Sequence, residues 1–112
     1  MSRIDKAKKK NKFAEYLLSR EDSTDFSRGA TKHLVEAARL GIQELLQFDM
    51  EEVKEKALVI KSFKKTNHEY SDFYKFYYKL KESEYSSTSS ASNALNTVKA
   101  FVNWVEENRR VN

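Results

Sequence analysis

The chain has 112 residues, a length that indicates one domain with a modest core, and its formal net charge is +4. Its composition, 39% hydrophobic and 34% charged, is normal for a globular domain with a well-solvated surface. The absence of cysteine excludes disulfides, thiolate nucleophiles and cysteine metal sites, and no apolar run approaches the ~20 residues of a membrane span. With no proline and two glycines, the chain has too few turn residues for a β-sandwich or an α/β fold. We therefore expect an all-α protein, a compact bundle of four to five helices in the cytoplasm.

The first half of the sequence predicts two helices. Residues 1–12 form a basic N-terminal tail that continues into a first helix over 4–19, and residues 13–112 form a single helical domain. The apolar edge of the first helix is expected at Phe13, Tyr16 and Leu17. A polar loop is expected over 20–29. A second helix over 30–47 follows, because Leu34, Val35, Ala38, Ile42, Leu45 and Leu46 recur at the spacing of one buried helix face.

The second half predicts three further helices. Asp49 with Glu52, and Thr66 with Glu69, have the spacing of capping boxes. They predict a helix over 50–65, with an inner face at Val53, Ala57, Ile60 and Phe63, and a helix over 67–82, with an inner face at Tyr70, Phe73, Tyr74, Tyr77 and Leu80. After a polar loop, a last helix runs to Arg109. Its apolar stripe is the clearest in the chain: Ala91, Ala94, Leu95, Val98, Phe101, Val102 and Val105.

The positive charge is concentrated in two segments. Residues 1–12 carry six basic side chains against Asp5, and residues 61–81 carry six lysines against two acids, whereas residues 13–60 have a net charge of −4. A localised basic patch attracts a polyanion more strongly than the same charge spread evenly. A solvated tail and favourable helix-dipole contacts are the alternative explanations for these lysines. The lysines expected to contact DNA phosphates are Lys8, Lys9, Lys10, Lys12, Lys61, Lys64, Lys65, Lys75, Lys79 and Lys81.

Six aromatic residues lie within nine positions of the fourth predicted helix. Aromatic rings interleaved with lysines can stack on bases or line a groove. Most of these rings fit the apolar stripe and are expected in the core, but Phe76 and Tyr78 fall outside it. Trp104 lies away from the stripe of the last helix, where it either covers the core edge or docks a neighbour. Phe76, Tyr78 and Trp104 are therefore the candidate partner-binding residues.

Hydroxyl residues gather at the start of the last helix, in the segment SSTSSAS. One of them is expected to cap the helix. The others could help to hold a phosphate, because the N-terminus of a helix carries free amides and a partial positive charge.

Enzyme motifs are not found. The two histidines, His33 and His68, belong to no metal-ligand spacing, and the chain has no dinucleotide-binding, P-loop or nucleophile-elbow motif. We expect a non-catalytic protein without a metal, a small-molecule cofactor or a membrane partner.

Residues 70–111 resemble the end of the core-binding (SAM-like) domain of phage integrases and other tyrosine recombinases. The resemblance rests on a helix ending at Leu80, a polar loop to Ser87, and a last helix that carries, in order, Leu95, Lys99, Phe101, Trp104, Val105 and Val111. It implies a helical bundle that clamps duplex DNA opposite a catalytic domain during recombination. By position, the implied DNA contacts near the last helix are Ser87, Thr88, Ser90 and Lys99.

The recombinase catalytic domain is absent from the sequence. The resemblance therefore implies a DNA-binding piece of a longer recombinase or a stand-alone relative, whose partners are double-stranded DNA and the missing catalytic domain. The alternative is a small helical regulator that docks a protein through exposed aromatic rings. The DNA hypothesis requires the lysines to gather on one side of the folded bundle.

Overall fold

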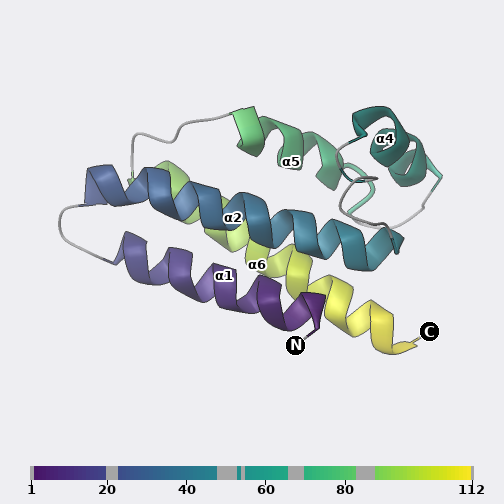
Figure 1. Ribbon diagram of the computed structural model, residues 1–112, viewed down its shortest axis with the longest axis horizontal. Coiled ribbons are helices and arrows are strands. Elements are labelled where there is room, and N and C mark those ends of the chain that lie inside the picture. The colour runs from purple at the N-terminus through teal and green to yellow at the C-terminus, as the bar shows by residue number, and fades with distance from the viewer. Residues whose placement is uncertain are drawn as a thin grey trace.

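In the part of the chain that the structure describes, three long helices form the body and two short helices cover one side of it (Figure 1). The computed structural model describes residues 2–19, 23–47, 53, 55–65, 70–82 and 88–111. These residues form five α-helices and no strand, which confirms the predicted all-α fold. The bundle has a radius of gyration of 13.7 Å and measures 41 × 27 × 24 Å along its principal axes.

Helices α1 (Arg3–Leu18) and α2 (Ser23–Leu46) lie side by side along most of their lengths. Ser2 caps α1, because its hydroxyl oxygen accepts a hydrogen bond of 3.1 Å from the backbone N–H of Asp5. The face of α1 that is buried against its neighbours is made mostly of small residues: Ile4, Ala7, Asn11, Ala14 and Leu18. Small side chains let the backbones of α1 and α2 approach closely.

Two expectations for this part of the chain were wrong. Residues 23–29 were expected in a loop, but they form the first two turns of α2. Phe13 and Tyr16 were expected to lie on the buried edge of α1, but their side chains are 51% and 55% exposed.

Helix α6 (Thr88–Val111) packs against both α1 and α2, and every residue of its predicted stripe is buried. Phe101 is the centre of this packing. Gly41 of α2 leaves room for the ring, because a Cβ atom at that position would lie 2.8 Å from Cε2 of Phe101. On its other side the ring stacks on Phe73 at a centroid distance of 3.7 Å. Phe101 thereby joins α2, α6 and the short helix α5.

Helices α4 (Lys56–Lys64) and α5 (Phe73–Glu82) form the cover. Phe63 and Val59 of α4 are buried, whereas Ala57, which was expected on the inner face, is exposed. Helix α5 buries its predicted stripe, with Phe73, Tyr74, Tyr77 and Leu80 all inside, and Tyr70 before it is half-buried. The two proposed capping boxes lie outside the described residues.

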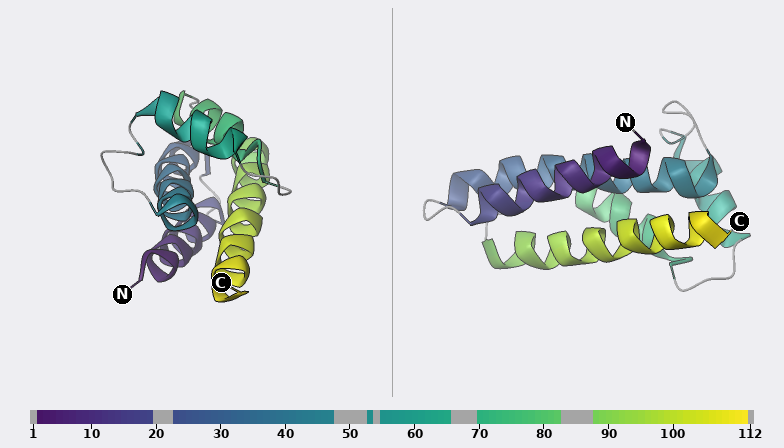
Figure 2. Two further views of the ribbon diagram at one scale, coloured as in Figure 1. Left: turned by 90° about the vertical axis from the view of Figure 1, so that its right-hand side faces the viewer. Right: turned by 90° about the horizontal axis from the view of Figure 1, so that it is seen from below.

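The end view in Figure 2 places α1 on one side of the bundle and the pair α4–α5 on the opposite side, with α2 between them and α6 running alongside from the level of α5 to the level of α1. The two basic segments of the sequence are carried by these two outer layers. The fold therefore separates the positive charge into two surfaces.

Candidate nucleic-acid interface

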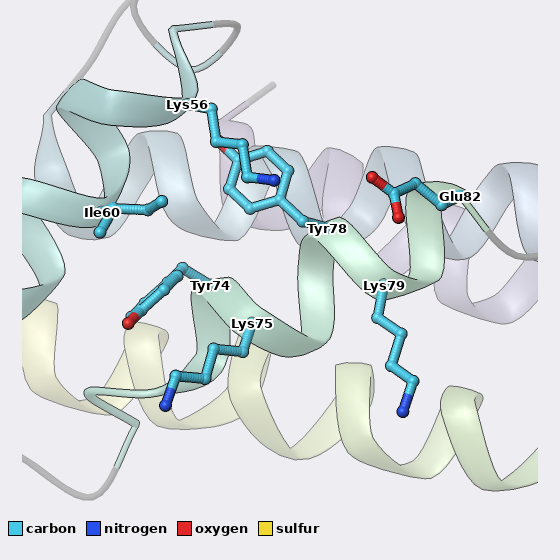
Figure 3. A pocket seen from close by; sticks show the side chains of 7 residues that line it. All are labelled: Lys56, Ile60, Tyr74, Lys75, Tyr78, Lys79 and Glu82. Atoms are coloured by element: carbon cyan, nitrogen blue, oxygen red, sulfur yellow. The ribbon is translucent and has the colours of Figure 1, made fainter.

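A groove lies between α4 and α5, on the outer side of the cover (Figure 3). Its volume is about 310 Å³. Helix α5 supplies most of the wall because one of its faces points away from the core along two full turns. The lining residues are Lys56, Ile60, Tyr74, Lys75, Tyr78, Lys79 and Glu82.

Lys75 and Lys79 lie one helical turn apart and extend in the same direction from α5 (Figure 3). Four residues of α-helix span ~6 Å, so the Cα atoms of the two lysines are spaced along the helix axis by about that distance. Both side chains are exposed. Lys75 contacts Asp72 at 3.7 Å, but this pair lies in water, with side chains 67% and 79% exposed. Such a pair is worth ~1 kcal/mol or less, so a phosphate can replace the carboxylate at little cost.

Two tyrosines form the floor of the groove, and both are held in place by the core. Tyr74 is 8% exposed and its ring lies 5.7 Å from that of Phe63. The hydroxyl of Tyr78 donates a hydrogen bond of 3.4 Å to the carbonyl oxygen of Val53. Burial raises the pKa of Tyr78, so the phenol stays neutral at physiological pH and adds no negative charge to the groove.

A third lysine closes the groove from α4. The ammonium group of Lys56 lies over the ring of Tyr78, 5.0 Å from its centroid (Figure 3). The ammonium group of Lys75 lies 6.0 Å from the ring of Tyr74. Lys56 was not among the residues selected from the sequence. Its position one turn before Ile60 becomes informative only when α4 and α5 are seen together.

The remaining predicted lysines of this layer are exposed but do not line the groove. Lys61, Lys64 and Lys65 lie at the end of α4, and Lys81 lies near the end of α5. Across residues 55–65 and 70–82 the cover carries seven lysines against Glu55, Asp72 and Glu82. The surface formed by α4 and α5, here called the cover surface, is therefore strongly basic.

The lysines of α1 lie on the other side of the bundle (Figure 2). The lysines therefore do not all gather on one side, and the condition set for the DNA hypothesis fails for the chain as a whole. Only the lysines of α4 and α5 share one side, so a DNA interface rests on these two helices alone. Lys9 and Lys12 are exposed, Lys10 is half-buried, and Lys8 forms an ion pair of 2.6 Å with Glu106 of α6. The physical reason is topological: α1 packs on α2 and α6, and the cover occupies the opposite face of the same two helices.

A second, smaller hollow of about 200 Å³ lies between α1 and α6. Lys99, which the recombinase resemblance selected, lines it and contacts Glu15 at 3.3 Å. Asn11 lies at its base, buried, and its Oδ1 has no hydrogen-bond partner among the described residues. The ion pairs of Lys8 and Lys99 connect α1 with α6, a contact that the sequence did not indicate.

The hydroxyl residues cannot be placed in the site. Thr88 and Ser90 belong to the first turn of α6, but their side chains, and the whole of Ser87, lie outside the described residues. Their contact with a phosphate stays a prediction.

The three candidate partner-binding rings are half-buried and packed against the core. The ring of Phe76 lies 5.5 Å from that of Phe73, and the ring of Trp104 lies 5.1 Å from that of Tyr70. Tyr78 forms part of the groove. Among the described residues, the most exposed rings are instead Phe13 and Tyr16 on α1, which the sequence pattern had assigned to the apolar edge of that helix.

Other kinds of site find no support in the described part of the chain. No three histidine, cysteine, aspartate or glutamate side chains come together to hold a metal ion. His33 packs its ring 4.6 Å from that of Phe13, and burial, followed by the charge of Lys10, lowers its pKa. Within the same residues, no helix combines the length and apolar character of a membrane span.

Comparison with protein-family models, with curated proteins and with solved structures gives no match. The candidate interface therefore has to be judged on its own geometry.

Proposed function

We propose that the chain is a non-catalytic DNA-binding module that holds duplex DNA by its phosphates on the cover surface. The observation that carries this proposal is the pair Lys75 and Lys79, which project together beside a groove that also holds Lys56 and two tyrosines. Phosphate contacts provide most of the affinity of sequence-independent DNA binding, because each neutralised phosphate releases condensed counterions.

The layout of the groove suits a phosphate backbone better than a small molecule. It is open, it is lined along α5 by Lys75 and Lys79 together with Glu82, and the phenol of Tyr78 is neutral at physiological pH. A duplex presents phosphates every 3.4 Å of axis along each strand, so a row of lysines on one helix can contact successive phosphates. Phosphate contacts position a protein on DNA without reading sequence. We therefore expect affinity for duplexes of any sequence.

The resemblance to recombinase core-binding domains is compatible with this proposal and supplies its most specific form. In that form the module would clamp DNA for a separate catalytic domain. Lys99, one of the residues selected by the resemblance, lies between α1 and α6 and away from the cover surface. The support for DNA binding thus comes from the lysines of α4 and α5, and the recombination role rests on the sequence resemblance alone.

The alternative is a regulator that docks a protein through Phe76, Tyr78 and Trp104. Each of these rings is packed against the core. If these rings turned away from the core to contact a partner, the apolar surface that they cover would become exposed to water.

Duplex binding is tested by fluorescence anisotropy with a labelled duplex of about 20 base pairs, titrated with the protein at several salt concentrations. We expect affinity to fall linearly with salt on logarithmic axes, with a slope of about −0.9 for each phosphate contacted. An affinity that is absent, or that does not change with salt, would refute the proposal.

A further inference from the structure

The outward face of α1 combines exposed aromatic rings with lysines. Phe13 and Tyr16 are 51% and 55% exposed, and they are the large hydrophobic residues that stand out in this way within the described residues. Lys9 and Lys12 are also exposed. Positions 9, 12, 13 and 16 follow the i, i+3, i+4, i+7 spacing of a single helix face. The four residues are here called the α1 face.

The rings of this face are arranged as separate platforms. The centroids of Phe13 and Tyr16 are 6.3 Å apart and their planes are tilted by 56°, so neither ring covers the other. Phe13 is supported from α2 by His33, whose ring lies 4.6 Å away. Because burial and Lys10 lower its pKa, His33 is neutral at physiological pH and acts there as a flat, uncharged ring.

We infer that the α1 face binds single-stranded nucleic acid, with unpaired bases stacked on Phe13 and Tyr16 and phosphates held by Lys9 and Lys12. Proteins that bind single strands combine these two elements, a cationic track for the backbone and aromatic side chains for the bases. On α1 each lysine lies four residues before a ring, Lys9 before Phe13 and Lys12 before Tyr16, so a cation and a ring adjoin twice along the helix.

The composition of the face favours nucleic acid over a protein partner. Protein interfaces are enriched in arginine as well as aromatic residues, and they are depleted in lysine. The cations of the α1 face are both lysines. Arg3, the arginine of α1, instead donates a hydrogen bond of 3.1 Å to the carbonyl oxygen of Gln43.

This inference extends the proposed nucleic-acid function to a second ligand and a second surface. The α1 face and the cover surface lie on opposite sides of α2 and α6 (Figure 2). One chain could then hold a duplex on one side and a single strand on the other, as at a junction where a duplex opens. The two sites can be tested independently because they share no residue.

The test uses two labelled single-stranded probes of about 12 nucleotides, oligothymidylate and an abasic strand with the same number of phosphates. Stacking contributes ~1–3 kcal/mol per base, which corresponds to a factor of about 5 or more. We expect the protein to prefer oligothymidylate over the abasic strand by at least about 5-fold. The double variant Phe13→Ala/Tyr16→Ala should lose this preference, and Phe13→Tyr/Tyr16→Phe should keep it.

Three controls make the outcome decisive. Both rings are exposed, so the alanine variant should keep the wild-type thermal melt and the wild-type affinity for duplex. Lys75→Gln/Lys79→Gln should weaken duplex binding and leave the preference for oligothymidylate unchanged. Equal affinity for the two probes, or a preference that survives in the alanine variant, would overturn the inference even if duplex binding holds. Competition by polyglutamate as effective as that by unlabelled oligothymidylate would likewise overturn it, because the face would then recognise charge alone.

Discussion

Replacing Lys75 and Lys79 by glutamine should weaken duplex binding by an amount that depends on salt. Each phosphate contact changes the logarithm of the binding constant by about 0.9 for every tenfold change in salt. If each lysine neutralises one phosphate, and if its contribution falls to zero at about 1 M salt, the double variant loses about 60-fold in affinity at about 0.1 M salt and about 9-fold at about 0.3 M. The exposure of Lys75 and the position of both side chains on the outer surface make a folding defect unexpected.

The assay is anisotropy with a labelled duplex at the two salt concentrations. The matched control is Lys6→Gln/Lys9→Gln, which removes the same charge from exposed positions of α1 on the opposite side of the bundle. Charges separated by more than the screening length of ~10 Å at 0.1 M interact weakly, so the control should have a much smaller effect. Equal losses in the two variants would show that net charge, and not the cover surface, determines binding. If the loss of duplex affinity in Lys75→Gln/Lys79→Gln is as large at the higher salt concentration as at the lower one, the counterion argument is refuted.

Three further predictions concern the fold. Gly41→Ala should lower the free energy of unfolding in denaturant titrations by about 1–3 kcal/mol, because its Cβ would meet the buried ring of Phe101 at 2.8 Å. At Gly29 of the same helix, an added Cβ atom would lie 3.4 Å from its nearest neighbour, so Gly29→Ala should leave the free energy of unfolding unchanged or raise it by up to ~1 kcal/mol. Equal effects at the two glycines would contradict this packing. Phe76→Ser should reduce stability by about 1–3 kcal/mol, and an unchanged melt would show that this ring is not part of the packed core. Burial raises the pKa of Tyr77 from 10.0 to about 12, so its neutral form stabilises the fold fully below pH 10 and this stability is lost as the pH rises towards 12. Denaturant titrations across that range should show the decline, and Tyr77→Phe should reduce it.

The helices with continuous apolar stripes could be predicted from sequence. The stripe of α6 and the core positions Leu34, Ala38 and Ile42 of α2 are buried as expected. In such helices the apolar residues recur on one face over several turns, so a single orientation satisfies most of them. The aromatic stripe of α5 was predicted for the same reason.

Helix α1 could not be oriented correctly, because its largest apolar side chains do not define its buried face. Phe13 and Tyr16 are exposed, while Ala7 and Ala14 are fully buried. The alternating spacing of three and four residues from Ile4 to Leu18 is a signal for this face, but alanine and asparagine within it weaken the signal. Close helix packing favours small residues such as alanine. Because a search for buried faces relies on large apolar side chains, it does not detect a face made of small ones.

The candidate site was only partly predictable. Lysines on one helix, such as Lys75 and Lys79, can be placed together from their spacing alone. The groove needs Lys56 from α4 as well, and the separation of α1 from the cover depends on how α2 and α6 pack between them. These are long-range relations that no local pattern in the sequence encodes.

The most direct test of the central claim is a nuclear magnetic resonance titration of isotope-labelled protein with a short duplex. At low salt, the amide and lysine signals that shift should belong to α4 and α5 and centre on the groove beside Lys75 and Lys79. Shifts confined to α1, or distributed evenly over the bundle, would contradict the assignment of the cover surface as the duplex-binding face.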